Sequence, residues 1–591
     1  MSILCLAIWS ALLSAAPSDA SDGAGPRVPR ALLWSRTGQG GERVLVGTRD
    51  ARSLMLVDLQ SRAVAWERPV GVRVASMERD PESGRILVGS EDGAVLVVDD
   101  DARVLGRYAI GRGRTHAIPL GGGRALAAAR WSREALVIEI ESGRIADRRP
   151  LTFAPGVVAS LGPDAVAVAD AFGGRIAVIR LGRVGGDRVF DLDGFAIRGL
   201  HLADAGKTLL VSHVKSFGTM PITKSNIDWG LVLSSKLTAL RVADLTADPA
   251  PSGLPMRRIA LDGSRNGAAD PATIAGVDRD RTIVLIASGA SHLLIQDRYE
   301  SGPGPDDGMP SLGNPSNAAV VETGENPVDL VVTPDGSRAV TADAMGDTLT
   351  VVSLADASRI ATIRLGPGAR SGRPELRGEA HFVDGGRSLD RWMSCATCHV
   401  DGHTVGVRFD TLGDGDHGAA KDTPSLLGVG RTPPYSWSGR FARLEEQVFQ
   451  SFESSMHGAT PSTGELADVV AYLRSLEPPP PKRDLDADLV ERGRVVFERR
   501  ECARCHAGPS FAGTGIVDVG LEDENGRRRF NPPSLIGLEH TAPYFHDGRA
   551  VDRAAVLRMH SPVVEDPISE TELAALEAYL LSLKPRSGHE R

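Results

Sequence analysis

The chain has 591 residues, of which 42% are hydrophobic and 24% charged, and its formal net charge is -9. A chain of this length is too long for one hydrophobic core, so we expect two to four domains. The acidic balance excludes the basic surface that nucleic-acid-binding proteins use and provides no polybasic membrane anchor, so we expect no nucleic-acid partner. The 66 glycines, against 14 phenylalanines and 6 tyrosines, indicate many tight turns between short strands.

Residues 1–20 resemble an export signal. The apolar run from Ile3 to Ala16 is too short to span a bilayer and ends in small residues that suit cleavage after Ala16 or Ala20. Because no basic residue precedes the run, an uncleaved signal that anchors the chain in the membrane is the alternative. We therefore expect an exported, periplasmic protein.

From about residue 30 to residue 370, short runs of Val, Ile and Leu alternate with turns rich in Gly, Asp and Ser. Strand–turn–strand units begin near Glu42, Gly84, Asp164 and Ser337. They recur at intervals of roughly forty residues, the period of a propeller blade, and predict an all-β propeller of about seven blades. The segment GENPVDLVVTPDGSRAVTADAMGDTLTVVSL resembles the YVTN-type β-propeller repeat. A pair of β-sandwiches is the alternative.

Two stretches interrupt the predicted blades. His213 to Lys236 is a long insertion, and Ser301 to Asn317 is rich in Gly and Pro. Long loops of a propeller usually lie at one face, where functional residues collect. A surface insertion that the fold merely tolerates is the alternative for both stretches.

After residue 370 the hydrophobic period becomes helical. We expect a mainly α domain over residues 375–477, called here the first helical block, and another over 485–585, the second helical block. The proline run at 478–481 separates them as a stiff linker. The segments RGEAHF, CATCH, TPSLLG and PYSWSGR of the first block match RGRVVF, CARCH, PPSLIG and PYFHDGR of the second. Their nearly constant spacing indicates a duplicated domain.

Four of the five cysteines lie in two C-x-x-C-H motifs. The first motif contains Cys395, Cys398 and His399, and the second motif contains Cys502, Cys505 and His506. Two thiols three positions apart on a helical turn can bond to both vinyl groups of one porphyrin, and the histidine that follows binds the iron. Zinc binding and dithiol redox chemistry are the alternatives. We expect two covalent c-type haems, each in its own mainly α cytochrome c-type domain.

The second axial ligand decides the chemistry of each haem. For the second haem we predict Met559, on the helix after the PYFHDGR turn, because a His/Met pair raises the reduction potential and suits electron transfer. The rival ligands in this block are His560, His546 and His540.

For the first haem we predict His417 as the second ligand. It lies in the Gly- and Asp-rich loop GDGDHGAAKD, so it can swing away and open the iron to a small molecule. The other candidates in this block are His403, Met456 and His457.

Taken together, residues 375–585 resemble the di-haem bacterial cytochrome c peroxidase superfamily, which includes MauG. The matching pieces are WMSCATCH, the GDH loop, TPSLLG, the W-x-G-R segment, LEEQ, CARCH and APYFHDGR followed by Met559. The resemblance implies that the haem of His506 and Met559 is a high-potential electron relay. It also implies that the haem of His399 is the low-potential peroxidatic site, with His417 as its displaceable ligand.

The same resemblance implies roles for side chains around the haems. Trp437 would lie between the two haems as a stepping point for electrons, with simple core packing as its alternative, and Gln447 would match a polar residue of the peroxide pocket. The family commonly places a glutamate before a methionine near this segment, but here Ser455 precedes Met456. A hydroxyl is a poor base for peroxide cleavage. Calcium between the haem domains, at Asp410 to Asp416, is a further possibility, with hydrated surface acid as its alternative.

Three functions fit these features. The first is a peroxidase-like oxidoreductase that moves electrons from the second haem to hydrogen peroxide or an unknown substrate at the first. The second is a non-catalytic electron-transfer cytochrome whose propeller docks a redox partner, such as a small cytochrome or a cupredoxin. The third is a propeller that itself binds substrate. His201, His213 and His292 are too scattered in the propeller sequence to suggest a metal cluster there.

Overall fold

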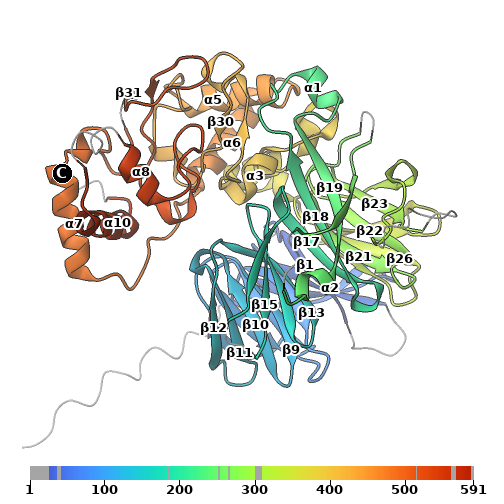
Figure 1. Ribbon diagram of the computed structural model, residues 1–591. Helices are drawn as coiled ribbons and strands as arrows, with labels where there is room; N and C mark the ends of the chain where they lie inside the picture. The colour runs from blue at the N-terminus through green and yellow to red at the C-terminus, as the bar shows by residue number, and fades with distance from the viewer. Residues whose placement is uncertain are drawn as a thin grey trace, which may run out of the picture.

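The computed structural model describes residues 25–35, 42–182, 185–249, 253–263, 266–299, 309–513, 515–560 and 567–586 (Figure 1). The predicted export signal lies outside these residues, as do residues 301–308 of the Gly- and Pro-rich stretch. Within the described ranges, no helix is long and apolar enough to cross a bilayer.

Seven four-stranded antiparallel sheets form the N-terminal region, and each sheet is a simple meander of consecutive strands. The first four blades are β1 (Pro29–Trp34), β2 (Arg43–Thr48), β3 (Ser53–Asp58) and β4 (Ala63–Pro69); β5 (Val74–Arg79), β6 (Ile86–Ser90), β7 (Ala94–Val98) and β8 (Val104–Ala109); β9 (Thr115–Gly121), β10 (Arg124–Ala129), β11 (Glu134–Glu139) and β12 (Ile145–Pro150); and β13 (Pro155–Gly162), β14 (Ala165–Asp170), β15 (Arg175–Arg180) and β16 (Arg188–Asp191). The last three are β17 (Phe195–Ala203), β18 (Thr208–Ser216), β19 (Leu233–Arg241) and β20 (Met256–Ala260); β21 (Pro271–Val277), β22 (Thr282–Ala287), β23 (His292–Asp297) and β24 (Ala319–Glu322); and β25 (Pro327–Val332), β26 (Arg338–Asp343), β27 (Thr348–Ser353) and β28 (Ser358–Arg364). The prediction of a seven-bladed propeller is confirmed.

Burial along each blade explains the two hydrophobic patterns of the sequence. The second strand of a blade, such as β6, is buried at every position, because both of its faces pack against neighbouring blades. The outermost strand, such as β4, alternates between exposed and partly buried positions. Continuous and alternating apolar runs therefore belong to different strands of the same blade.

The ring closes between the first and last blades, where β1 lies beside β25 and β26. Asp347 accepts hydrogen bonds from the backbone nitrogens of Arg27, at 2.8 Å, and Val28, at 2.6 Å. Asp329 accepts another from the backbone nitrogen of Leu32, at 2.8 Å. Every blade consists of consecutive strands, so no strand is shared between the first blade and the last. The contacts between these two blades therefore hold the ring closed.

The insertion from His213 to Lys236 lengthens the β18–β19 hairpin and carries a short helix, α1 (Lys224–Asp228), at its tip. The hairpin reaches the first helical block, where the backbone nitrogen of Ile222 donates to the Asp410 carbonyl at 2.9 Å. Ile222 and Ile227 are buried in a cluster with Trp392 of that block. The insertion is therefore a structural arm of the propeller that holds the first helical block.

The two helical blocks have the same internal design. The first contains α3 (Pro374–Phe382), α4 (Cys395–Cys398), α5 (Leu444–Gln450) and α6 (Thr463–Ser475), with β29 (Arg408–Phe409) and β30 (Lys421–Asp422). The second contains α7 (Ala487–Arg499), α8 (Arg553–Met559) and α10 (Glu570–Ser582), with β31 (Val517–Asp518) and β32 (Arg529–Phe530). In each block the first helix packs on the last, α3 on α6 and α7 on α10. Gly378 of α3 and Gly493 of α7 lie directly against a backbone carbonyl of the partner helix, where a side chain would clash.

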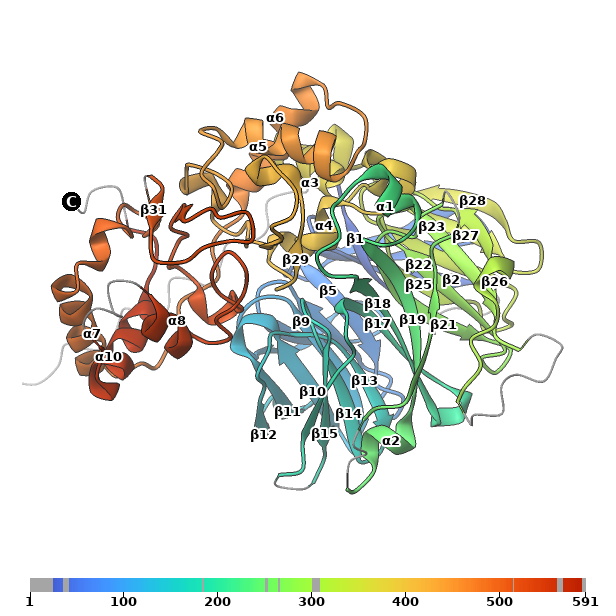
Figure 2. The same ribbon diagram turned by 45° about the horizontal axis from the view of Figure 1, so that its top comes forward.

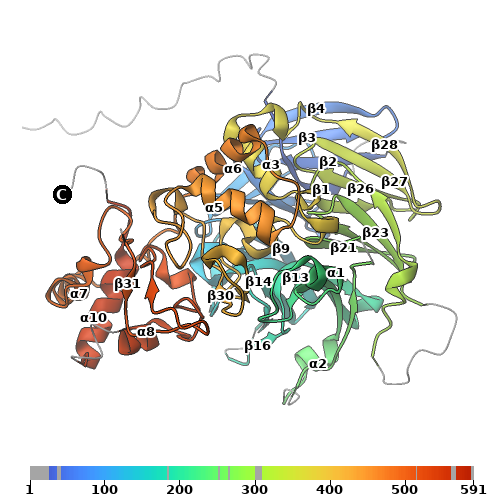
Figure 3. The ribbon, with the colours of Figure 1, turned by 90° about the horizontal axis from the view of Figure 1, so that it is seen from above.

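The first helical block covers one face of the propeller, and the second lies beside it (Figures 2 and 3). A hydrophobic cluster joins propeller residues such as Phe172 and Phe195 to Met393, Val405 and Phe409 of the first block. The first block is therefore packed against the propeller as part of one structure.

Candidate haem sites

The first motif lies on one helical turn, α4, which ends at His399. The backbone nitrogen of Ser394 donates to Thr397 Oγ1 at 2.9 Å, which fixes the start of this turn. Burial lowers the pKa of His399 to about 4, and its backbone neighbour in the site is the Pro424 carbonyl. The imidazole is therefore neutral at physiological pH, as a metal ligand must be.

The second motif places its histidine in the same way. His506 Nδ1 lies 3.2 Å from the Pro533 carbonyl and 3.3 Å from the Phe511 carbonyl. Pro533 occupies the position in PPSLIG that Pro424 occupies in TPSLLG. A carbonyl that fixes Nδ1 orients the ring and leaves Nε2 for a metal.

The residues of both motifs fit covalently bound haem. The four cysteines are free thiols, although two of them stand three positions apart in each motif. Burial raises the pKa of Cys395 to about 12 and that of Cys502 to about 11, so both side chains are protonated thiols at physiological pH. Among the described residues, no group of three or more His, Cys, Asp and Glu could hold a metal ion. Thioether attachment, with the neutral histidine as iron ligand, matches this donor set best.

The propeller holds the first motif directly. Asp270, next to β21, accepts hydrogen bonds from Ser394 Oγ at 2.6 Å and from Thr397 Oγ1 at 2.8 Å. Arg198 of β17 donates to the Ala396 carbonyl at 2.8 Å. Asp270 is only 1% exposed, so this contact is a buried polar one with both carboxylate oxygens paired. The turn that carries Cys395 and Cys398 is thereby fixed to the propeller.

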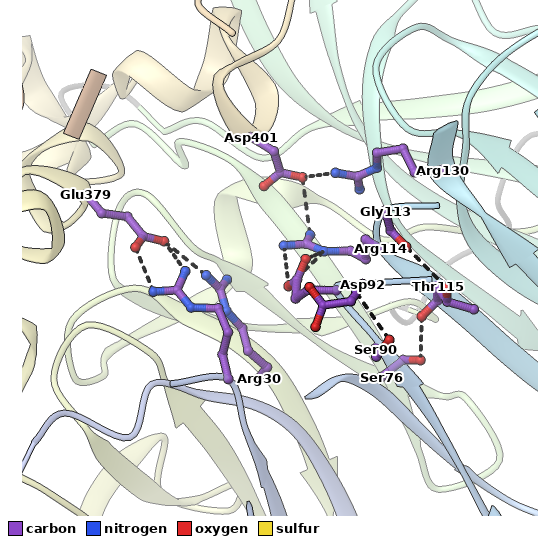
Figure 4. Close-up of polar contacts among 12 residues, drawn as sticks. Arg30, Ser76, Ser90, Asp92, Gly113, Arg114, Thr115, Arg130, Glu379 and Asp401 are labelled. Carbon is purple, nitrogen blue, oxygen red and sulfur yellow. Dashed lines mark hydrogen bonds and ion pairs between the residues drawn. The ribbon is translucent and has the colours of Figure 1, made fainter. Parts of the chain in front are cut away.

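Ion pairs around this contact join the first helical block to arginines at the innermost strands (Figure 4). Glu379 of α3 binds Arg49 through two hydrogen bonds, of 2.5 and 2.7 Å, and Arg30 at 3.1 Å. Asp401, two residues after His399, pairs with Arg130 at 2.5 Å and Arg114 at 3.2 Å. Burial by itself would raise the pKa of Glu379, but the two arginines lower it to about 2. The carboxylate therefore stays ionised at any physiological pH.

The predicted ligand His417 lies at the boundary between the two helical blocks. Its Nδ1 is 3.4 Å from Asp410 Oδ1, and its carbonyl accepts a hydrogen bond from Asn525 of the second block at 2.9 Å. Among the described residues, His417 has no hydrogen bond or ring contact with His399. Its role as an iron ligand stays a prediction.

The other ligand candidates of the first block are engaged elsewhere. His403 uses both ring nitrogens, with Ser425 Oγ and the His540 carbonyl each at 2.8 Å. His457 Nε2 lies 2.9 Å from the Ile222 carbonyl of the propeller arm. Met456 is buried with its sulfur 3.7 Å from Cys395 Sγ. These three side chains have structural contacts that account for their positions.

Gln447 lies on α5, which continues into a π-helical turn over Ser451–Ser455. Gln447 Nε2 donates to Ser451 Oγ at 3.3 Å. Glu453, two residues before Ser455, is exposed and accepts a hydrogen bond from Thr460 Oγ1 at 3.2 Å. A π-helical turn often marks a functional site, but this one presents hydroxyls and an amide where peroxide cleavage needs a carboxylate.

Trp437 lies where the two helical blocks meet. Its carbonyl accepts a hydrogen bond from the backbone nitrogen of Asn531 in the second block, and its indole Nε1 donates to the Asp422 carbonyl, each at 2.8 Å. The backbone nitrogen of Asp422 donates in turn to the His546 carbonyl at 2.7 Å. Trp437 and His546 occupy matching positions of the duplicated blocks, as do Asp422 and Asn531. The blocks therefore contact each other reciprocally, through equivalent backbone groups.

The second block brings one candidate close to His506. The ring centroids of His506 and His560 lie 6.3 Å apart, whereas Met559, at the end of α8, is 38% exposed. His546 is stacked on Phe530, with ring centroids 3.9 Å apart. Met559 as the iron ligand stays a prediction, and His560 is the rival that lies beside the motif.

Comparison with known proteins finds a family that the first helical block matches. Residues 375–477 match the family model of the di-haem cytochrome c peroxidases. The first helical block is therefore similar to this family over its whole length.

Two relatives and one solved structure show how far the likeness extends. The gamma subunit of hydrazine synthase from Kuenenia stuttgartiensis is 28% identical over 232 residues, which are 29% of this chain and 65% of the relative, a little under two thirds of its length. Cytochrome c551 peroxidase from Nitrosomonas europaea is 23% identical over 265 residues, 35% of this chain and 78% of the relative. A structure of Kuenenia stuttgartiensis hydrazine synthase aligns with a TM-score of 0.47 and 19% identity, covering 57% of this chain and 99% of that one.

A lysine lies between the two helical blocks, next to the stretch where calcium was a possibility. Lys421 Nζ lies 3.1 Å from Asp414 Oδ2 and 3.0 Å from Asp523 Oδ2, and it donates to the Ala419 carbonyl at 2.7 Å. The ammonium group thus supplies the positive charge between these acids. The arrangement gives no support to a calcium site there.

Sequence reasoning missed the propeller residues of the site. Asp270, Arg198 and Arg49 are far from the first motif in the chain, and each looks like an ordinary turn or strand residue of a blade. The duplication, by contrast, was visible in the sequence. Aligning the two helical blocks pairs Trp437 with His546, and these two residues lie at the boundary between the blocks.

Proposed function

We propose that the protein is an exported di-haem c-type oxidoreductase of the peroxidase type. Electrons from a small cytochrome or cupredoxin would enter at the second motif and pass to hydrogen peroxide or another substrate at the first. The contact through Trp437 is the observation that carries this proposal, because it joins the two motif-bearing blocks by reciprocal hydrogen bonds.

The two motifs differ in exposure, which supports the direction of electron flow. In the first motif Ala396 and Thr397 are buried beneath the propeller, whereas Ala503 and Arg504 of the second are exposed. A redox partner needs an exposed edge to dock on, and a substrate site benefits from enclosure. The second motif is therefore the better entry point for electrons.

Each residue would have a defined task. When bound, the haems supply reversible one-electron chemistry. The cysteine thiols would hold them as thioethers, and His399 and His506 would bind their irons, with Nδ1 of His506 turned to the Pro533 carbonyl. Trp437 would fill the space between the blocks and keep water from it, and Gln447 would orient a small polar substrate.

A non-catalytic electron-transfer cytochrome is the second candidate. It is favoured by the polar side chains near Gln447, which include Ser451 and Ser455 but lack a buried carboxylate for moving the peroxide proton. The propeller would then serve as a docking surface and as the frame of the first motif. The two candidates differ in whether the first haem reacts with a small molecule.

Reaction of the half-reduced protein with hydrogen peroxide separates these candidates. The full-length chain, produced with a haem-maturation system, is reduced at its higher-potential haem, mixed with peroxide and followed by visible absorption. Rapid re-oxidation that repeats with each addition of reduced cytochrome supports the peroxidase. Because one relative is a subunit of hydrazine synthase, hydrazine is the second compound to test.

A matched variant tests the part that Trp437 plays. Trp437→Phe keeps an aromatic ring but loses the hydrogen bond to the Asp422 carbonyl, so re-oxidation of the second haem should slow while the absorption spectra of both haems stay the same. Absence of any fast reaction with either compound in the wild type would contradict the enzyme and leave electron transfer as the function.

A further inference from the structure

The last turn of α8 presents two adjacent candidate ligands on different sides. Leu557 packs in the hydrophobic cluster that also contains Cys502 of the second motif. A residue three positions later lies on the same face of a helix, whereas a residue two positions later lies nearly opposite. His560 therefore follows Leu557 toward the motif, and Met559 points away and is 38% exposed.

The backbone holds His560 in this place. Its nitrogen donates to the Val556 carbonyl at 2.9 Å, which closes the last turn of α8. The side chain is half-buried. Within the described part of the chain, neither ring nitrogen has a hydrogen-bond partner.

The spacing of the two rings is that of two ligands on one metal. The centroids of His506 and His560 are 6.3 Å apart, and the ring planes are inclined by 47°. Two imidazoles that each bring a nitrogen to about 2 Å from a shared metal have centroids roughly 6 Å apart. Since the Pro533 carbonyl lies at His506 Nδ1, the nitrogen left for that metal is Nε2.

The other histidines of this block have different neighbours. His540 packs edge-on against Trp131 of the propeller, with centroids 4.9 Å apart. His546 is stacked on Phe530 and is 1% exposed. In the described part of the chain, neither of these rings packs against that of His506.

We propose that His560, not Met559, is the second axial ligand of the haem at the second motif. This inference rests on the proposed function only in requiring a haem there. A methionine sulfur raises the reduction potential of a haem, and a second imidazole does not. A second imidazole in place of methionine would therefore leave the second haem at a lower potential.

Ligand spectroscopy of the full-length oxidised protein tests the proposal without any assay of turnover. Visible absorption and electron paramagnetic resonance identify the ligands, and a spectroscopic redox titration gives both potentials. In the wild type we expect a low-spin second haem without the methionine-to-iron charge-transfer band. Met559→Leu, the matched control, should change neither the spectra nor either potential.

Two variants of the proposed ligand complete the test. His560→Met should raise one of the two potentials and create the charge-transfer band. His560→Ala should lose one low-spin haem per chain, and added imidazole should restore it. Loss of a low-spin haem in Met559→Leu, or its retention in His560→Ala, would overturn the proposal. A haem count below two per chain, measured separately, would contradict the proposed function as well.

Discussion

At the scale of single residues, Asp422 is the clearest difference between the duplicated halves of the haem region. Asp422 and Asn531 hold equivalent positions and donate equivalent backbone hydrogen bonds across the boundary between the blocks. The Asp422 carboxyl is buried with Oδ1 unpaired, and burial raises its pKa well above the ordinary value. An ionisable group thus stands where the other half has a neutral amide.

Replacing Asp422 by Asn should stabilise the protein at neutral pH. Because the pKa is raised, the folded protein keeps this proton to higher pH than the unfolded chain, so stability falls as the pH rises from about 4 through the folded pKa. Asp422→Asn removes that loss. Thermal unfolding of the haem region should shift upward at pH 7 and coincide with the wild type near pH 4.

The reverse change, Asn531→Asp, is the matched control and should lower the unfolding temperature at pH 7. A less stable Asp422→Asn protein at pH 7 would mean that the carboxylate makes a needed ionic contact, with Arg408 as the nearest opposing charge.

At the scale of elements, the β18–β19 hairpin is longer than its blade requires. Its nine-residue strands project beyond the blade and carry α1 to the first helical block. Ile227, on α1, is 1% exposed in the cluster with Trp392, whereas its neighbour Trp229 is 77% exposed. One face of the tip therefore packs against the haem region, and the other face lies in solvent.

Truncation of Ile227 should loosen the first helical block. Ile227→Ala removes buried methyl groups and should cost roughly 2–5 kcal/mol of unfolding free energy. We expect faster proteolysis between the propeller and the first block, and a broadened absorption band of the first haem only. Trp229→Ala, a larger truncation on the same helix, should leave both measurements unchanged. Equal effects of the two variants would show that α1 does not anchor the block.

At the scale of the whole molecule, the two motifs differ in their contacts with the propeller. It fixes the first motif through Asp270 and Arg198 and pairs Glu379 with Arg49, while the second motif stays exposed. The two copies of the duplicated domain therefore differ: the first motif is enclosed by the propeller, and the second is open. That difference, absent from the motifs themselves, supports a division into substrate site and electron entry.

Neutralising Glu379 should detach the first block from the propeller. Glu379→Gln leaves Arg49 and Arg30 without their buried partner, at a cost of roughly 3–5 kcal/mol. The pKa of Glu379 is lowered to about 2, so its contribution is complete above about 4.3 and is lost as the pH falls toward 2. The variant should therefore differ from the wild type at pH 7 and approach it in acid.

Thermal unfolding at pH 7 and pH 3 measures this effect. Glu491→Gln, which breaks an exposed pair with Arg494, is the control and should change the unfolding temperature little. A Glu379→Gln protein as stable as the wild type at pH 7 would assign the docking to the hydrophobic cluster alone.

The sequence by itself determined the features that depend on neighbouring residues. The blade period, the helical period and the C-x-x-C-H motifs are local patterns, because strand pairing and thioether attachment use residues a few positions apart. The duplication was also visible, since it repeats such patterns. These sufficed to predict the seven-bladed propeller and the family that residues 375–477 match.

Only the tertiary structure decided which distant groups meet. Asp270 and Arg198 reach the first motif across the interface between propeller and helical block, and no local pattern encodes that meeting. Met559 and His560 are adjacent in the chain, and the helix turns just one of them toward His506. The physical reason is that successive residues of a helix point about 100° apart, so the way α8 packs in the whole molecule fixes which of the two neighbours faces the motif.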